Sequence, residues 1–142
     1  MFFDAGYVEI GMDHFALPTD SLYKAMESKK LHRNFMGYTA GKTHLMIGLG
    51  MSSISDSWYA FAQNEKSVED YQERVNKGLL PVFRGHLLTE TDLIIRQHIL
   101  NLMCHLETDW KLGVTEKQRE DIVDRLAEMF EDGVLDQRGC KW

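Results

Sequence analysis

Cysteine and proline are scarce in this chain of 142 residues, which contains two of each. Cys104 and Cys140 cannot alone hold an iron–sulfur cluster or a structural zinc ion, because such sites need three or four ligands. We expect free thiols in a reducing compartment, with a disulfide as the less favoured alternative. No apolar run approaches the roughly 20 residues of a membrane helix, and the N-terminus lacks the basic flank of a secretory signal. We therefore expect a cytoplasmic protein without a membrane partner.

Basic residues are also fewer than acidic ones, 16 against 22, which gives a net charge of −6. Residues 115–132 contain seven acidic and three basic side chains, so phosphates would repel a helix formed there. We expect no nucleic-acid partner. The hydrophobic fraction of 44% and the charged fraction of 27% are typical of a globular chain and exclude a disordered one.

Two strands are predicted before residue 86. Residues 7–10 alternate apolar and polar side chains, and residues 44–50 form an apolar run without alternation, as in a strand buried on both faces. Residues 11–18 are expected to run from a strand end into a loop. Residues 31–43 and 51–64 lack a steady period and are predicted as loops, the first of a length that is often functional. Two strands do not form a stable sheet alone, which indicates a piece of a larger protein or pairing between copies.

Helices are predicted where a capping residue precedes apolar residues at helical spacing. The first follows Thr19 or Asp20 and runs to about Lys30, and the second runs from Ser67 to about Lys77. The sequence pattern changes to helical spacing of apolar residues near residue 86, after a connector marked by Pro81 and Gly85. Two further helices are predicted there, with capping pairs Thr89–Asp92 and Thr115–Gln118, and residues 134–142 are expected to begin a strand.

Several clusters could carry chemistry, and each also has a structural interpretation. Asp13 and His14 could orient a proton or bind a propionate, although a loop cap and a backbone-bonded histidine fit as well. In residues 32–35, an arginine could hold a carboxylate and a phenylalanine could stack on a planar ligand, or the segment could be a solvated loop. Residues 48–53 contain a Gly-x-Gly that favours a tight turn over a phosphate site. His98, Cys104 and His105 are not placed as metal ligands, and we expect no metal site in this chain.

The motifs GYVEIGMDHFALP, LHRNFMGYT, LMIGLGMSSIS, AQN and the RG of VFRGH resemble oxygen-independent coproporphyrinogen III oxidase. They occur in the family's order and are most similar over about residues 6–85. This resemblance implies a radical S-adenosylmethionine enzyme whose 5′-deoxyadenosyl radical starts each decarboxylation. The family converts two propionate side chains of coproporphyrinogen III to vinyl groups and gives protoporphyrinogen IX for haem biosynthesis. It holds a [4Fe-4S] cluster on three cysteines near its N-terminus.

The resemblance also implies an α/β fold. The chain would contain the last strands and helices of a partial (β/α) barrel in residues 1–85. A mostly helical, winged-helix-like and truncated C-terminal domain would follow in residues 86–142. The family's CxxxCxxC cluster motif is absent, so the chain is similar to the C-terminal portion of such an enzyme. We expect the chain alone to be inactive and its exposed strand edges to self-associate.

Two positions correspond to family residues beside a bound S-adenosylmethionine, namely Phe35 and Ile54. Both are apolar, which suits packing against an adenine or a sulfonium methyl group. Arg33 and His14 lie in shared motifs and are the candidates for binding a substrate carboxylate. Met36 stands where the family usually has glutamine, and Ala40 where it usually has a second threonine. The loss of the glutamine removes a polar contact to the cofactor region.

Two alternatives stay open. The haem-chaperone branch of the same superfamily usually lacks the HRNF loop, which makes it the second choice. The other is a non-catalytic module that binds a ligand or a protein and has kept the motifs without the chemistry.

Overall fold

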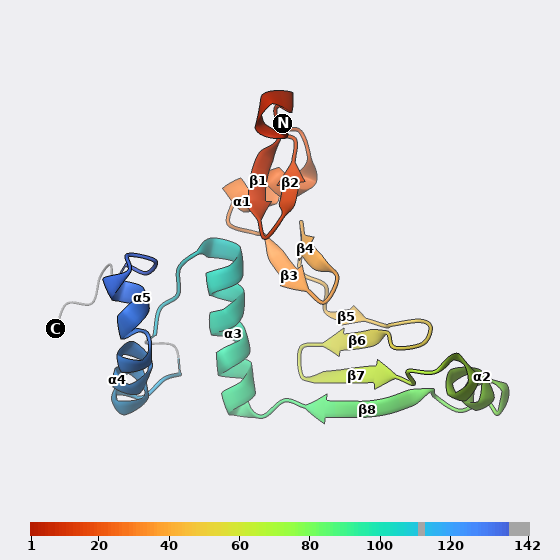
Figure 1. Ribbon diagram of the computed structural model, residues 1–142. Helices are drawn as coiled ribbons and strands as arrows, with labels where there is room; N and C mark the ends of the chain where they lie inside the picture. The colour runs from red at the N-terminus through yellow and green to blue at the C-terminus, as the bar shows by residue number, and fades with distance from the viewer. Residues whose placement is uncertain (111–112, 137–142) are drawn as a thin grey trace. The chain divides into compact units, whose positions relative to one another are not determined.

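The computed structural model describes residues 1–110 and 113–136 (Figure 1). Its contacts divide the chain into two compact units, Met1–Thr108 and Asp109–Trp142. The first unit contains a hairpin, a helix, a second hairpin, a four-stranded sheet and a long helix, and it carries all the candidate site residues. No helix in the described part of the chain is long and apolar enough to cross a membrane.

The N-terminal part of the first unit is an antiparallel hairpin followed by a short helix. Gly11 ends the first strand, as expected, and pairs with His14 across the turn, but the loop expected to follow contains the second strand. Asp20 caps the helix by accepting a hydrogen bond from the Leu22 amide at 2.7 Å, as the sequence predicts. The elements are η1 (Phe3–Ala5), β1 (Val8–Gly11), β2 (His14–Ala16) and α1 (Ser21–Glu27).

The predicted loop over 31–43 is wrong, because its central part is a second antiparallel hairpin. Strands β3 (His32–Asn34) and β4 (Gly37–Thr39) are joined by the two residues Phe35 and Met36. The Asn34 side chain accepts a hydrogen bond from the Met36 amide at 2.8 Å, and Gly37 has φ +121°. An Asx-type bond and a glycine with positive φ close a turn that hydrophobic periodicity does not reveal.

Three further predictions fail in the four-stranded antiparallel sheet. The expected buried strand over 44–50 is a two-residue edge strand, and Leu45, Ile47 and Leu49 are exposed. The expected loop over 51–64 and the connector around Gly85 contain the other three strands. The sheet order is β5 (Leu45–Met46), β6 (Ile54–Ser57), β7 (Ala60–Asn64) and β8 (Val82–Leu87).

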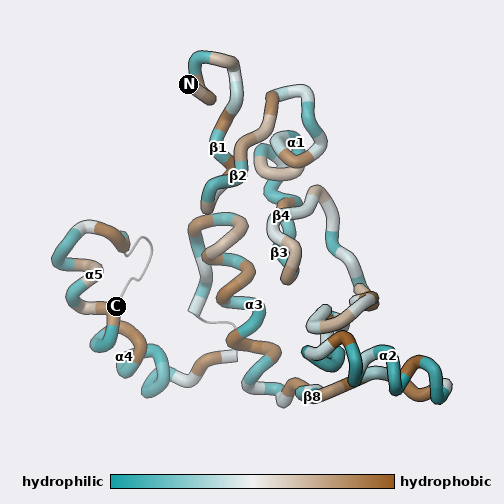
Figure 2. The backbone as a smooth tube through the Cα atoms, turned by 45° about the vertical axis from the view of Figure 1, so that its right-hand side comes forward, coloured by the Kyte–Doolittle hydropathy of each residue, from teal (hydrophilic) through white to brown (hydrophobic). Residues whose placement is uncertain are grey.

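The predicted helices are confirmed together with their caps. Helix α2 (Val68–Asn76) begins after Ser67 and connects β7 to β8. Helix α3 (Glu90–His105) has the capping box of Thr89 with Asp92, and both hydrophobic and hydrophilic residues occur along it (Figure 2). A small core of buried residues joins α3 to the two hairpins and α1, and it consists of Ile10, Ala16, Ala25, Leu31, Tyr38 and Cys104.

The second unit contains two short helices in its described part. Helix α4 (Glu116–Arg125) has the predicted capping box of Thr115 with Gln118. The single predicted helix is interrupted at Leu126 and continues as α5 (Ala127–Glu131). Residues 134–136 are in neither helix nor strand, and the rest of the predicted C-terminal strand, with Cys140, lies outside the described residues.

The fold is mixed α and β, which confirms the predicted class at that level. Every strand pair in the described residues is antiparallel. The partial barrel, the winged helix and the division into 1–85 and 86–142 stay predictions about a complete protein. In this chain the first unit extends to Thr108, because α3 packs against β3.

We expect Gly48→Ala to destabilise the first unit by about 1–3 kcal/mol. A Cβ atom at Gly48 would lie 2.8 Å from the carbonyl oxygen of Ile54, and that backbone belongs to the sheet and cannot move freely. Urea unfolding measures the loss. The matched control is Gly41→Ala, where a Cβ atom meets no atom within 4 Å. Equal midpoints for the two variants would contradict this account of Gly48.

Candidate cofactor and substrate site

Tyr38 brings His14 and Arg33 together. Its buried ring is met edge-on by the His14 ring at 5.2 Å between centroids, and the Arg33 guanidinium carbon lies 4.6 Å from its centroid. Arg33 and Tyr38 are also partners across the β3–β4 hairpin. The Tyr38 hydroxyl donates a hydrogen bond of 2.8 Å to the Met103 carbonyl on α3. The two predicted substrate residues therefore share one aromatic support.

Arg33 carries a buried donor that is not used within the described residues. Its Nη1 atom is shielded from solvent and has no hydrogen-bond partner there. An unsatisfied buried donor of a charged group is costly, and a carboxylate would satisfy both its charge and its hydrogen-bonding capacity. Burial raises the pKa of the nearby Cys104 thiol, and the Arg33 charge opposes part of this effect. The environment of Arg33 is thus suited to an anion.

His14 has a clear structural role. Its Nδ1 atom lies 2.9 Å from the Met12 carbonyl oxygen, so Nδ1 carries the hydrogen and donates. Its Nε2 atom lies 2.7 Å from the place where a Cβ atom on Gly37 would be, which requires glycine there. Asp13 is exposed in the turn with φ 65°. The backbone-bonded interpretation of His14 is therefore confirmed, and its binding of substrate stays a prediction.

Phe35 and Ile54 lie toward the same face of the sheet. In the β6–β7 register, Ile54 is opposite Gln63 and Asp56 is opposite Phe61, so alternation places all four side chains on one face. The Phe35 ring meets the Phe61 ring edge-on, with 5.2 Å between centroids and 88° between planes. Phe35 is 54% exposed, so much of its surface is available to a ligand. The two predicted cofactor residues are thereby brought to one side of the sheet.

The loop before Ile54 is organised by Asn64, which the sequence analysis met only as the last residue of the AQN motif, without a role. The buried Asn64 amide nitrogen donates at 3.0 Å to the carbonyl oxygens of Gly48 and Gly50. It also lies 3.0 Å from the Ser53 hydroxyl, which donates to the Gly50 carbonyl at 2.6 Å. These bonds hold the Gly-x-Gly segment against the sheet, directly before a turn at residues 51–52, which agrees with the turn interpretation.

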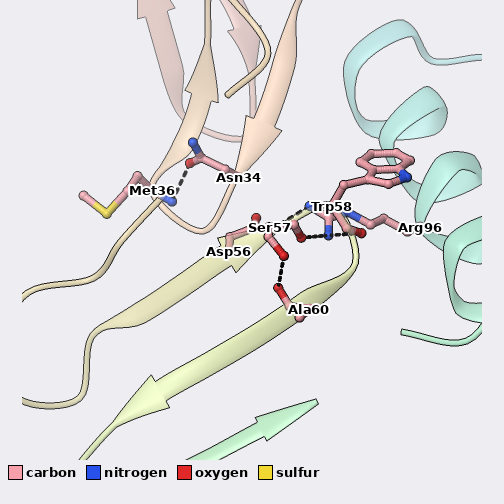
Figure 3. Close-up of polar contacts among 7 residues, drawn as sticks. All are labelled: Asn34, Met36, Asp56, Ser57, Trp58, Ala60 and Arg96. Carbon is pink, nitrogen blue, oxygen red and sulfur yellow. Dashed lines mark hydrogen bonds and ion pairs between the residues drawn. The ribbon is translucent and has the colours of Figure 1, made fainter. Parts of the chain in front are cut away.

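Arg96 was also missed, although it makes three hydrogen bonds across the first unit. From α3 it donates to the Asp56 carboxylate at 2.8 Å and to the Ser57 and Trp58 carbonyls at 2.8 and 3.2 Å (Figure 3). Helical spacing on α3 identifies a helix but not a partner 40 residues away. The one available signal was a lone arginine within the apolar run of α3.

Met36 lies in the turn beside Phe35 and points away from Arg96 (Figure 3). Its amide donates to Asn34, and its side chain is largely exposed. The substitution for the family's usual glutamine leaves the turn itself intact, because the hydrogen bond uses only the backbone of Met36. A thioether can still pack against a ligand there.

No metal centre is found in residues 1–110 and 113–136, where no three His, Cys, Asp or Glu side chains lie together. Cys104 is a free, buried thiol. His98 is buried in α3 with its Nδ1 atom 2.8 Å from the Thr108 hydroxyl. This contact joins α3 to the last residue of the first unit.

His32, in the second hairpin, has a pKa set by burial and by nearby charges. Its pKa is lowered from the ordinary value of 6.5, first by burial and then by the charges of Lys42 and Arg96, while Asp56 opposes the shift. A lowered pKa in the folded state means that the unfolded chain binds the proton more readily. Protonation of His32 therefore reduces the free energy of unfolding as the pH falls below about 6.5.

We expect an NMR titration of His32 to give a pKa below 6.5 and Lys42→Gln to raise this pKa. The substitution removes the second cause of the shift and leaves burial in place. Lys66→Gln is the matched control, because Lys66 lies over Phe83 on β8 and is not among the causes of the shift. A His32 pKa that does not respond to Lys42→Gln would rule out this electrostatic coupling.

Comparison with known proteins gives one consistent answer. The chain is 38% identical over 136 residues to the anaerobic coproporphyrinogen III oxidase 1 of Cereibacter sphaeroides, covering 92% of this chain and 29% of that protein. It is 37% identical over 139 residues to the oxygen-independent coproporphyrinogen III oxidase of Escherichia coli, covering 93% of this chain and 30% of that protein. With the oxygen-independent coproporphyrinogen III oxidase of Pseudomonas aeruginosa the identity is 44% over 103 residues, covering 72% of this chain and 22% of that protein. No protein-family model matches the chain.

The backbone agrees with the sequences. The solved structure of coproporphyrinogen III oxidase from Escherichia coli, a radical SAM enzyme, superposes with a TM-score of 0.80 at 34% identity. The match covers 96% of this chain and 33% of that one, so the chain spans about a third of its structural relative. The resemblance seen in the motifs is confirmed: over nearly its whole length, this chain is related to one segment of the oxygen-independent coproporphyrinogen III oxidases.

Proposed function

We propose that this chain is the C-terminal portion of an oxygen-independent coproporphyrinogen III oxidase. The complete enzyme would oxidatively decarboxylate coproporphyrinogen III to protoporphyrinogen IX in haem biosynthesis. The observation that carries the proposal is the backbone match of 0.80 at 34% identity to a radical SAM enzyme of that name. Because the chain spans about a third of that enzyme, we expect no oxidase activity from the chain alone.

The cofactors of the proposed enzyme would be S-adenosylmethionine and a [4Fe-4S] cluster. Together they would supply the radical chemistry that oxidises the substrate. The described residues provide no cluster site, so the proposal assigns the three cluster cysteines to the part of the enzyme outside this chain. What this chain would contribute is a surface for S-adenosylmethionine and a group for the substrate.

Phe35 and Ile54 are the proposed contacts to S-adenosylmethionine. Their placement toward one sheet face supports a shared role, since a flat adenine could lie against the exposed Phe35 ring. Neither side chain can accept or donate a hydrogen bond, so both would bind by packing and by excluding water.

Arg33 is the proposed partner of a substrate propionate. Its buried, unused Nη1 atom supports this role, because a propionate carboxylate would supply an acceptor and a charge. Tyr38 would hold the guanidinium plane through the cation–π contact. His14 is proposed as the second substrate-binding residue and would also support Tyr38.

The finer architecture belongs to the same proposal. The sheet and hairpins would join the last part of a partial (β/α) barrel, and α4 and α5 would open a winged-helix-like domain. The division into residues 1–85 and 86–142 and a cytoplasmic location are proposed with them. The haem-chaperone alternative is less favoured, since the relatives compared above are named as oxidases.

We expect Arg33→Ala to raise the KM for coproporphyrinogen III about tenfold, as expected for losing roughly 1.4 kcal/mol of a charged hydrogen bond. The assay uses an Escherichia coli oxidase in which this chain replaces the matching segment. Arg84→Ala is the control, because Arg84 is exposed on β8 and bonds Gln63. An active chimera with an unchanged KM would remove Arg33 from this role, and an inactive, folded chimera would count against the proposed function.

We also propose that the isolated chain self-associates through the β8 edge. This strand ends the sheet, and its residue Leu87 is 80% exposed. We expect sedimentation velocity to show species larger than 16.5 kDa that increase with concentration, and Leu87→Lys to reduce them. Leu106→Lys, at an exposed leucine after α3, is the control. A concentration-independent monomer would contradict the proposal.

A further inference from the structure

Arg96 connects α3 to the turn between β6 and β7. Its guanidinium nitrogens donate to one carboxylate, that of Asp56, and to two backbone carbonyls of the turn (Figure 3). The Arg96 side chain is 14% exposed and that of Asp56 is 9% exposed. A guanidinium with this many acceptors is held in one orientation, because each bond restricts the planar fork in a different direction.

The same guanidinium supports an aromatic ring. Its central carbon lies 4.8 Å from the Phe61 centroid and 4.9 Å from the Trp58 centroid. Asp56 and Phe61 are partners across β6 and β7, so the ion pair and the ring occupy the same sheet face. Phe61 thus packs against a group whose position is set by hydrogen bonds.

The Phe61 ring in turn meets Phe35. The edge-to-face contact of 5.2 Å joins the sheet to the tip of the β3–β4 hairpin. Phe35 lies in a two-residue turn and is half exposed, where an aromatic side chain would otherwise sample several rotamers. A fixed Phe61 ring selects the rotamer that reaches it.

We propose that Arg96 is a positioning residue that sets the orientation of Phe35 through Phe61 and so prepares the hairpin tip for S-adenosylmethionine. The inference rests on the proposed function for the identity of the ligand. The contacts from Arg96 to Phe61 and from Phe61 to Phe35 are independent of which ligand binds. Arginine is required in this role, because lysine would keep the charge but lose the planar surface and the fork.

The test uses the full chain of 142 residues with isotope-labelled phenylalanine. Nuclear Overhauser contacts between the rings of Phe35 and Phe61 report the geometry, and a titration with S-adenosylmethionine reports the affinity. Arg96→Met alone would leave Asp56 buried without a partner and could unfold the unit. The main variant is therefore Arg96→Met with Asp56→Asn, which removes both charges. Arg96→Lys tests whether charge alone suffices.

Arg84→Met is the matched control, since Arg84 is on the same sheet face and its guanidinium bonds Gln63 at 2.9 Å. We expect the double variant and Arg96→Lys to lose the Phe35–Phe61 contacts while the signals of the Tyr38 core persist. The dissociation constant for S-adenosylmethionine should rise about tenfold, as in Phe35→Ala. Adding Phe35→Ala to the double variant should then weaken binding little further, because both changes remove the same contact.

The two proposals fail in different ways. Persistence of the ring contacts in the double variant, or full additivity with Phe35→Ala, would overturn the positioning role of Arg96. If the unsubstituted chain shows no saturable response to S-adenosylmethionine but the ring contacts depend on Arg96, the proposed cofactor contact fails and the positioning of Phe35 stands.

Discussion

The buried phenol of Tyr38 is the interaction on which the first unit depends most. Its hydroxyl bonds the α3 backbone at Met103, its ring supports His14 and Arg33, and it leaves only 3.0 Å to a Cβ atom at Gly11. The core has no fully buried side chain among the described residues, so one ring that joins both hairpins to α3 carries a large share of the packing. Loss of this ring would separate elements that local propensity alone cannot hold together.

Helix α3 acts as the common support for hairpin and sheet. Met103 receives the hydrogen bond from the hairpin, and Arg96 binds the turn of the sheet. Seven residues make two helical turns, so both attachment points lie on one face, about 10 Å apart. This spacing places the hairpin tip beside the sheet, where Phe35 meets Phe61. The candidate site is thus built from two attachments to one rigid helix.

The sequence predicted what local rules determine and missed what distant contacts determine. The caps at Asp20, Ser67, Thr89 and Thr115 were found, because a cap and its amide partner lie within three residues. Three of the four strands of the sheet were missed, since short, partly exposed strands with mixed polarity show no clean alternation. The motifs identified Arg33, Phe35 and Ile54, but Asn64 and Arg96 act on partners 11 to 40 residues away. Such pairings are visible only in the folded chain.

Arg96 and Arg33 differ in how far their hydrogen-bond donors are used by protein acceptors, and this difference distinguishes their roles. Arg96 is bound to a carboxylate and two carbonyls, so an incoming anion would have to displace protein acceptors. Arg33 has a buried Nη1 atom without an acceptor in the described residues, so its hydrogen-bonding capacity is not used by protein groups there. The pKa of His32 in the same region is lowered first by burial and then by the charges of Lys42 and Arg96. The contrast between the two arginines supports the two proposals made above, in which Arg33 binds a carboxylate and Arg96 holds the surface beside it.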